Sequence, residues 1–249
     1  MKNYKKIVSY IRWKILKLVR LDFIKSAYGP YFHANYEDST FEYYIRGNYG
    51  NYLAEYITLH KNQAIFIDVG ANQGLYSIIA AKNKNFIKIY AFEPVQETFN
   101  LLIKNIDLNK VSKSVIPIKA AVDNSNKNKL INYSNVHSGG ASFHHSFAHS
   151  KTYTVSCLDS DRLNELVSCE DHEVFVKIDT EGYEPIVINE LRKTLFWKNI
   201  TFIYFEVDNN WYDETDIIRT LKNDGFEEIY KTNQGASHFD IAMKRKYKI

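Results

Sequence analysis

Short apolar runs alternate with amphipathic helical patterns along the chain downstream of about the first sixty residues. Apolar runs of about four to eight residues are typical of buried strands, and apolar positions spaced by three and four are typical of helices. Strands that alternate with helices form βαβ units and pair in parallel. We predict strands over residues 64–68, 87–92, 115–119, 173–179 and 200–207. We predict helices over residues 74–83, 96–108, 184–195 and 214–224.

Two further segments depart from this alternation. "EEIYKT" and "HFDIAMKR", near the C-terminus, are rich in β-formers and are joined by a short Asn-Gln-Gly linker, which predicts an antiparallel hairpin at the sheet edge. Residues 134–150, "SNVHSGGASFHHSFAHS", form the longest stretch without periodicity. Loops of this length in compact domains are often lids or binding loops, so we predict such a loop here.

The N-terminal segment, residues 1–25, predicts an amphipathic helix. Ile7, Ile11 and Ile15 fall near one face at helical spacing. Basic side chains interrupt every apolar run and no small-residue cleavage site follows, so we expect neither an export signal nor a membrane span. Two interpretations remain open: a helix that packs on the main domain, or a basic helix that lies on an anionic membrane surface.

The composition, 45% hydrophobic and 24% charged over 249 residues, fits one soluble α/β domain with a short appendage. The net charge of +3 conceals an asymmetry. Residues 1–25 carry eight Lys or Arg against Asp22 alone, so this segment is +7 and the remainder is −4. An acidic main body argues against a nucleic-acid partner. Cys157 and Cys169 are too few for a disulfide framework, which favours a reducing, cytoplasmic location.

The turn after the first predicted strand, in "IFIDVGANQGLYSIIAA", has the form of a ligand-binding turn. Glycines before a helix offer N–H groups to an anion at the carboxyl end of a parallel strand. A dinucleotide fingerprint aligned on Gly70 needs glycines at 72 and 75, where this chain has Asn72 and Leu75. Asp68 would also face the diphosphate. NAD and FAD therefore fit poorly.

A cofactor with a cationic end fits better. S-adenosylmethionine carries an ammonium and a sulfonium, which Asp68 could complement directly or through water. The helix N-terminus after Gly74 would take the carboxylate of the cofactor. Glu93 ends the next predicted strand, 19 residues beyond Gly74, about where an acid binds ribose hydroxyls in nucleotide-binding βαβ units. Either acid alone could be a helix cap or a turn residue, but the two together favour the cofactor.

The sequence resembles a known family at this point. "DVGANQG", "FEP", "KIDTEGYE" and "FIYFEV" follow one another in the order seen in FkbM-type methyltransferases. The resemblance covers roughly residues 45–245, so we expect a methyltransferase domain over 45–249 and a basic helical extension over 1–44. It implies the Rossmann-like class I methyltransferase fold, a mostly parallel seven-stranded sheet with an antiparallel edge hairpin. It also implies S-adenosylmethionine as cofactor, and it assigns the cofactor site to Asp68, Gly70, Asn72, Gly74 and Glu93.

A second acidic constellation follows the fourth predicted strand, in "FVKIDTEGYE". If this strand lies beside the first one, its end faces the reactive methyl group. A neutral hydroxyl is a weak nucleophile, so a carboxylate or histidine that takes its proton is expected. Asp179 and Glu181 are the leading candidates, and Glu206 and Asp208, at the end of the next strand, could line the acceptor pocket. Two alternatives stay open: one acid caps a helix, or the acids bind Mg²⁺.

The histidines match no zinc signature. His238 opens the last predicted strand, and four others lie in the long loop, where one of them could act as a base when the loop closes over a polyol. These four are His137, His144, His145 and His149.

The sequence thus predicts a cytoplasmic, S-adenosylmethionine-dependent O-methyltransferase. Its predicted acceptor is a hydroxyl of a sugar, glycan or related natural product, as in polysaccharide modification. In the membrane interpretation, residues 1–25 place the enzyme at the inner face of the membrane. The alternatives are a methyltransferase for nucleic acid or protein and a non-catalytic cofactor-binding scaffold. The absent (D/N)PP(Y/F) motif argues against the first, and the two acidic clusters argue against the second.

Overall fold

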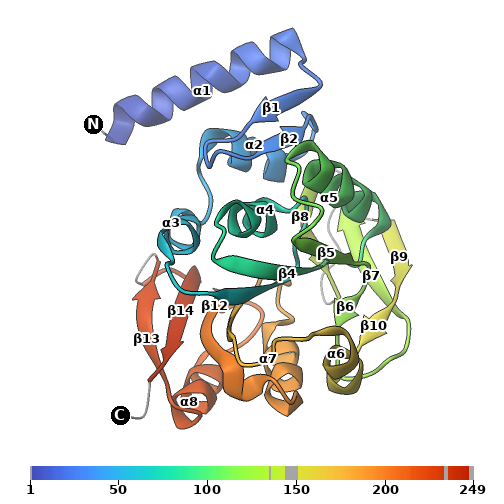
Figure 1. Ribbon diagram of the computed structural model, residues 1–249. Coiled ribbons are helices and arrows are strands. Elements are labelled where there is room, and N and C mark those ends of the chain that lie inside the picture. Colours follow the sequence, from blue (N-terminus) through green and yellow to red (C-terminus); the bar gives the residue numbers. More distant parts are fainter. Residues whose placement is uncertain (1, 135, 144–150, 233–234, 247–249) are drawn as a thin grey trace.

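The computed structural model describes residues 2–134, 136–143, 151–232 and 235–246, built around a seven-stranded sheet (Figure 1). The strand order is β13-β14-β12-β11-β3-β4-β5. The five strands that pair in parallel are β3 (Ala64–Val69), β4 (Phe86–Phe92), β5 (Val115–Ile118), β11 (Glu173–Ile178) and β12 (Ile200–Asp208). These bounds agree with the five predicted strands to within one residue, because each is a nearly continuous apolar run.

The last two strands close one edge of the sheet. β14 (His238–Arg245) pairs antiparallel with β12 on one side and with β13 (Phe226–Lys231) on the other. On the opposite side the chain runs outward from β3 to β4 and β5, and it then returns to place β11 against β3. The direction of winding therefore reverses between β3 and β11, and ligands of open α/β sheets bind at such a point.

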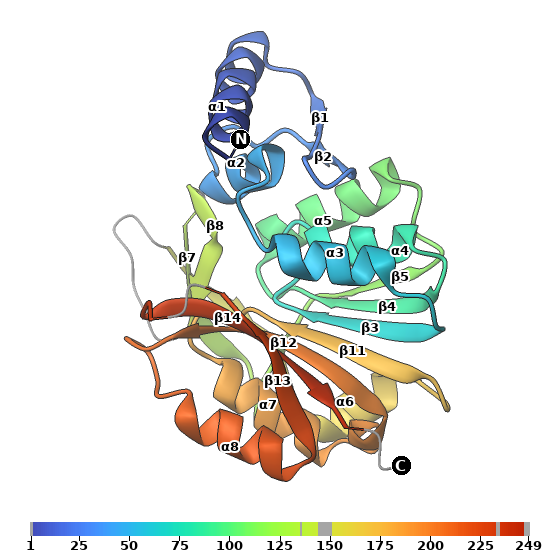
Figure 2. The same cartoon turned by 90° about the vertical axis from the view of Figure 1, so that its left-hand side faces the viewer.

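Helices cover both faces of the sheet (Figure 2). α4 (Leu75–Lys82) and α5 (Gln96–Leu108) lie on one face, and α6 (Ser160–Leu166), α7 (Glu184–Lys193) and α8 (Thr215–Asn223) lie on the other. β3 shows how the two layers are built. Phe66 belongs to the apolar cluster on the α4 face, whereas Ile65 and Ile67 belong to the cluster on the α7 face. Alternate side chains of one strand thus anchor opposite helical layers.

The N-terminal region adds elements that periodicity did not predict. They are β1 (Phe23–Lys25), β2 (Tyr31–His33), α2 (Ser39–Arg46) and α3 (Asn51–Leu59). Phe32 and Phe41 are fully buried in the same apolar cluster as α4, so this region shares its core with the sheet domain, and residue 44 falls within α2. Before it comes the predicted helix, α1 (Lys2–Val19), at one end of the molecule (Figure 1). No helix of the described residues is long and apolar enough to cross a membrane.

The prediction of a loop over residues 134–150 is wrong for its first half. Residues 137–142 form β8 (His137–Ser142), which pairs with β7 (Lys129–Ser134), and β7 pairs in turn with β9 (Lys151–Val155). The sequence "HSGGAS" has no apolar alternation, so only its tertiary partners reveal the strand. Residues 144–150 lie outside the described residues. Short strands β6 (Ala121–Val122) and β10 (Cys157–Leu158) pair in parallel, and a 3₁₀ turn, η1 (Trp197–Asn199), precedes β12.

Candidate active site

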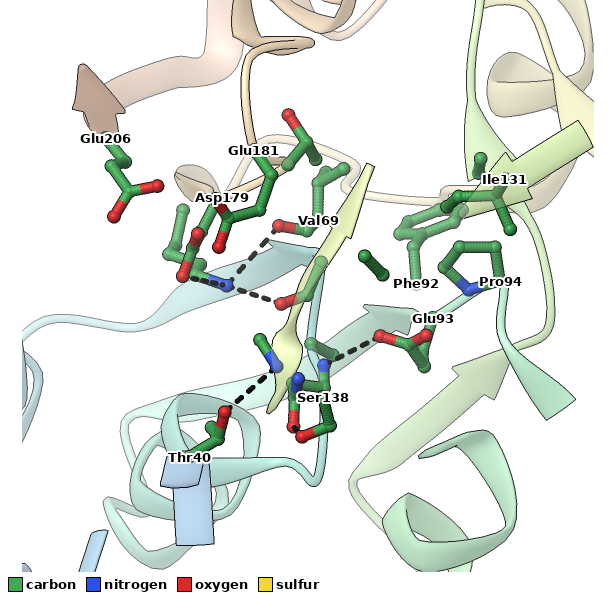
Figure 3. A pocket seen from close by; sticks show the side chains of 18 of the residues that line it. Thr40, Val69, Phe92, Glu93, Pro94, Ile131, Ser138, Asp179, Glu181 and Glu206 are labelled. Carbon is green, nitrogen blue, oxygen red and sulfur yellow. Dashed lines mark hydrogen bonds and ion pairs between the residues drawn. The ribbon is translucent and has the colours of Figure 1, made fainter. Parts of the chain in front are cut away.

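A cavity of about 420 Å³ lies at the carboxyl ends of β3, β4, β11 and β12. This volume falls in the range of small-molecule sites, about 300–1,000 Å³. Figure 3 shows Glu93, Phe92 and Pro94 on one side of it and Asp179, Glu181 and Glu206 on the other. Six of the eight predicted cofactor and catalytic residues therefore line one cavity, although they come from four separate strand ends.

The turn after β3 is built close against the neighbouring strand. Gly70 has φ of 75°, and a Cβ on it would lie 1.9 Å from the carbonyl oxygen of Asp179, so only glycine fits. Its N–H and that of Ala71 donate to the carbonyl of Phe92, at 3.1 and 2.9 Å. Asn72 has φ of 50° and lines the cavity together with Gly70. The turn thus joins the ends of β4 and β11.

Glu93 lies at the end of β4, as predicted, with 5% of its surface exposed. The backbone N–H of Asn72 donates to its Oε2 at 3.0 Å, and that of Val95 donates to its Oε1 at 2.9 Å. Burial raises the pKa of Glu93 to about 7, although these two hydrogen bonds act in the opposite direction. Each oxygen retains a lone pair, so the carboxylate can accept from two hydroxyl groups of a ligand in the cavity.

The other two predicted cofactor residues do not line the cavity. Asp68 is fully buried, and its Oδ2 accepts from the N–H and the hydroxyl of Ser77 at 3.1 and 2.6 Å. The ammonium of Lys177 lies 3.3 Å from Oδ1. The structure therefore places Asp68 beside Lys177 and away from the cavity lining, and its contact with a cationic cofactor end, directly or through water, stays a prediction. Gly74 is the N-cap residue of α4, with φ of 94°, and a Cβ on it would lie 2.6 Å from the side chain of Leu102.

Lys177 connects the two sides of the cavity, and sequence reasoning did not select it. Its side chain is buried, and its ammonium donates to the carbonyl of Gly70 at 2.6 Å and lies 3.6 Å from Asp179 Oδ2. Burial lowers its pKa, but the charges of Asp68 and Asp179 outweigh that effect, so the pKa is raised. A single lysine inside the apolar strand "EVFVKI" was the available signal, because a buried lysine needs an acidic partner.

Three carboxylates converge at the ends of β11 and β12. One oxygen each from Asp179, Glu181 and Glu206 lies within 4.8 Å of the other two. Burial, together with the negative charge of Glu206, raises the pKa of Glu181 to about 10. Burial and Asp179 raise the pKa of Glu206 to about 8.

The structure does not support the alternative that one of these acids caps a helix. Glu184 accepts from the backbone N–H groups of Thr180 and Gly182, at 2.7 and 3.1 Å. The turn before α7 is therefore closed by Glu184. Asp179 and Glu181 instead line the cavity, as do Asp208 and Glu206.

Neighbouring side chains orient two of the three carboxylates. The hydroxyl of Tyr49, from the segment between α2 and α3, donates to Asp179 Oδ2. His238 Nε2 lies 3.0 Å from Glu206 Oε1, and its Nδ1 lies 3.5 Å from Asp208 Oδ2. These partners raise the pKa of His238 to about 9, with the hydrogen bond to Glu206 as the largest cause. His238 is therefore protonated at neutral pH and unsuited to the role of base.

The strand β8 forms a wall of the cavity and is fixed by α2. The hydroxyl and N–H of Ser138 donate to the two oxygens of Asp38 at 2.6 and 3.1 Å, and Gly139 N–H donates to Thr40 Oγ1 at 2.9 Å (Figure 3). Asp38 also caps α2 by accepting from the N–H of Thr40 at 3.0 Å. Of the predicted loop histidines, His137 lines the cavity beside Ser39, while His144, His145 and His149 lie outside the described residues.

Comparison with known proteins adds a family to this geometry. The model of the methyltransferase FkbM domain matches residues 68–228, which is well over half of the chain. The matched range contains the turn after β3, Glu93 and all three acids of the cluster. No curated protein matches the sequence.

Two solved structures of low identity share the fold. The tRNA m1G37 methyltransferase of M. jannaschii is 16% identical, with a TM-score of 0.50, 91% of this chain covered and 55% of that one. M. capricolum TrmK, solved with S-adenosylhomocysteine, is 10% identical, with a TM-score of 0.50, 80% of this chain covered and 69% of that one. Methanocaldococcus jannaschii Trm5, solved with adenosine, is 17% identical with a TM-score of 0.45. The match covers 80% of this chain, which spans about half the length (49%) of Trm5.

Proposed function

Because this chain belongs to the FkbM methyltransferase family, we propose that it transfers a methyl group from S-adenosylmethionine to a hydroxyl of a sugar, glycan or related natural product. The observation that carries the proposal is the division of one cavity into two acidic ends. A single buried carboxylate, Glu93, stands at the end of β4, and three carboxylates stand at the ends of β11 and β12. The first end suits the ribose of the cofactor, and the second suits a hydroxylic acceptor.

The cofactor end fits a nucleoside. Glu93 is held in place by two backbone N–H groups, so it would accept the two ribose hydroxyls without reorganising. Phe92 and Pro94 give apolar surface beside it, and Gly70 and Asn72 bring backbone close to the cavity. When bound, S-adenosylmethionine supplies an electrophilic methyl group on its sulfonium sulfur. Asp68 acts indirectly in this proposal, by holding Lys177 against the turn.

The acceptor end provides a proton acceptor. Methylation of a neutral hydroxyl requires that its proton leave, and Asp179 is the acid of the three that pairs with Lys177. Glu181, with a pKa of about 10, is protonated at neutral pH unless a cation joins it, so Asp179 is the better base. Glu206 and Asp208 lie within the same wall and would accept hydrogen bonds from further hydroxyls of a polyol.

Two measurements test this proposal. Calorimetric titration should show binding of S-adenosylhomocysteine and no detectable binding of NAD. Incubation with S-adenosylmethionine and a panel of sugars and glycans should then give a methylated sugar by mass spectrometry. Binding of NAD alone would overturn the cofactor. Transfer to RNA or protein in the same assay, with no transfer to sugars, would overturn the acceptor class. The net charge of −4 outside residues 1–25 supports an acceptor other than a nucleic acid.

A further inference from the structure

Glu206 carries a buried oxygen that has no hydrogen-bond partner among the described residues. This residue is 6% exposed, and its Oε1 faces His238, whereas its Oε2 has no partner. A buried carboxylate oxygen without a partner is costly, so its environment implies a group that the chain itself does not provide. Oε2 belongs to a side chain that lines the cavity.

The positions of its two neighbours indicate what that group is. Oxygens of Asp179, Glu181 and Glu206 lie within 4.8 Å of one another, and Figure 3 shows the three side chains converging. Oxygens on opposite sides of one ion are about 4.2 Å apart for Mg²⁺ and about 5 Å apart for Ca²⁺. The observed spacing therefore admits a single ion with little side-chain movement. An all-oxygen ligand set suits hard cations.

The surroundings of the cluster also resemble the outer shell of a metal site. Tyr49 and Lys177 contact Asp179. His238 contacts Glu206 through Oε1 and not through Oε2, the oxygen that has no hydrogen-bond partner among the described residues. Outer-shell partners of this kind orient ligating carboxylates. Among the described residues, the ion pairs and the cluster bring five carboxylates together with two cationic side chains. The groups are Asp68, Asp179, Glu181, Glu206, Asp208, Lys177 and His238.

We infer that Asp179, Glu181 and Glu206 bind one hard divalent cation, Mg²⁺, Mn²⁺ or Ca²⁺, at the acceptor end of the cavity. The role of this ion would be to hold the acceptor hydroxyl, and that role rests on the proposed function. The binding of the ion to the protein does not rest on it. A carboxylate has two oxygens, so Asp179 can give one to the ion and keep the other as the proton acceptor.

Titration of chelator-treated protein with Mn²⁺ tests the inference, with electron paramagnetic resonance as readout and with neither cofactor nor acceptor present. We expect one saturable ion per chain. Glu206→Gln and Glu181→Gln should each raise the Kd for Mn²⁺ at least about tenfold. Glu165→Gln, an exposed site on α6, is the matched control and should bind as wild type. The Kd for S-adenosylhomocysteine should stay unchanged in all three variants, which also verifies their folding.

Absence of saturable Mn²⁺ binding to wild type would overturn the cation site, as would unchanged binding to both cluster variants. If Glu206→Gln does not fold, Glu181→Gln decides alone, because its side chain is less buried. These results are separate from the proposed function. That function fails on absent S-adenosylhomocysteine binding or absent sugar methylation, whether or not the ion binds.

The helix α1 carries an independent observation. It contacts the domain mainly through Trp13, which is 2% exposed and packs against Tyr36 and Phe41, with ring centroids 5.9 Å apart in both pairs. Ile11 and Leu18 lie about 160° and 140° from Trp13 around a helix of about 100° per residue. The apolar side of α1 therefore faces away from the domain. Six apolar side chains on that side are 45–85% exposed, namely Ile7, Val8, Ile11, Ile15, Leu18 and Val19.

We propose that this face of α1 binds an anionic membrane surface. Residues 1–25 carry eight basic side chains and one acidic one, and Lys14, the residue after Trp13, borders the apolar side. A basic helix with one apolar face is complementary to anionic lipid headgroups above acyl chains. α1 lies at the end of the molecule, away from the sheet (Figures 1 and 2), so a flat surface can reach it.

Sedimentation with vesicles tests this second proposal. We expect wild type to bind vesicles of phosphatidylcholine with phosphatidylglycerol, to bind those of phosphatidylcholine alone much less, and to dissociate in high salt. Ile11→Asp with Leu18→Asp should reduce the bound fraction at least about tenfold. The pair Leu166→Asp and Leu195→Asp, both exposed elsewhere, should not reduce it. Equal binding by the α1 variant would overturn the proposal, and so would a dimer in light scattering that only this variant abolishes.

Discussion

The two ends of the cavity satisfy their carboxylates in different ways. At the end of β4, the two oxygens of Glu93 each accept from a backbone N–H, so the charge is held by the fold itself. At the ends of β11 and β12, two of the three carboxylates, Asp179 and Glu206, are held by side chains, and one buried oxygen of Glu206 has no partner in the described part of the chain. In the proposed function, the cofactor end would therefore be complete before a ligand arrives, whereas the acceptor end would be completed by the group that binds there.

Lys177 stands between the two ends. It reaches Asp68 and the carbonyl of Gly70 on the β3 side and Asp179 on the β11 side. If the two ends have these separate roles, a substitution at the acceptor end should change turnover and one at the cofactor end should change cofactor affinity. A substitution of Lys177 should change the stability of the whole domain.

The largest expected effect is on turnover at the acceptor end. Asp179→Asn preserves shape and removes basicity, so it should reduce kcat by roughly 10²–10⁴-fold with an active acceptor. The Kd for S-adenosylhomocysteine should barely change, because Glu93 is untouched. Glu181→Gln is the parallel variant, and treatment with EDTA separates a cation requirement from simple base catalysis. If neither variant nor EDTA slows turnover, the carboxylates are structural.

The next largest effect is expected for Lys177, the residue that contacts both ends of the cavity. Lys177→Met removes the ammonium beside the fully buried Asp68 and leaves an uncompensated buried charge. We expect the free energy of unfolding to fall by about 3–5 kcal/mol in denaturant titrations. Lys113→Met, on an exposed turn, should change it by less than about 0.5 kcal/mol. A small effect of Lys177→Met would show that the two ends are not linked through this side chain.

A substitution at the cofactor end should change only the affinity for the cofactor. Glu93→Ala would remove the two proposed charge-assisted hydrogen bonds to ribose and should weaken S-adenosylhomocysteine binding by about 2–3 kcal/mol. Calorimetric titration measures this loss, and Mn²⁺ binding to the same variant should remain that of wild type. Unchanged nucleoside affinity would move the ribose site away from β4.

The smallest expected effect is a dependence of that affinity on pH. Burial raises the pKa of Glu93 to about 7, and only the ionised form accepts from both hydroxyls. The Kd for S-adenosylhomocysteine should therefore rise by up to about tenfold per pH unit below 7, and Glu93→Gln should flatten that profile. Without ligand, the contribution of Glu93 to stability is present below its ordinary pKa of 4.5 and is lost as the pH rises through about 7. An identical profile in Glu93→Gln would assign the titration to another group.

Local sequence patterns were enough for the sheet and for part of the site. Apolar runs gave the strands, and the spacing between Gly74 and Glu93 located the acid at the end of β4. The same reasoning did not predict that Asp68 is buried beside Lys177, because Lys177 lies more than a hundred residues away and spacing carries no information about it. Tyr49 was missed for the same reason. Residues 137–142 were predicted to lie in a loop because their small side chains show no period. They form β8 by pairing with β7, and Asp38 and Thr40 then tether β8 to α2.

The triple engagement of Asp38 has a practical consequence for trimming the protein. This side chain closes the first turn of α2 and also receives hydrogen bonds from Ser138 and Gln73. A fragment that starts at residue 45 would lack it, and would lack Phe32 and Phe41 from the core as well. The wall formed by β8 would lose its anchor, although every strand of the large sheet would still be encoded. An expression fragment that preserves the cavity therefore has to begin upstream of β1.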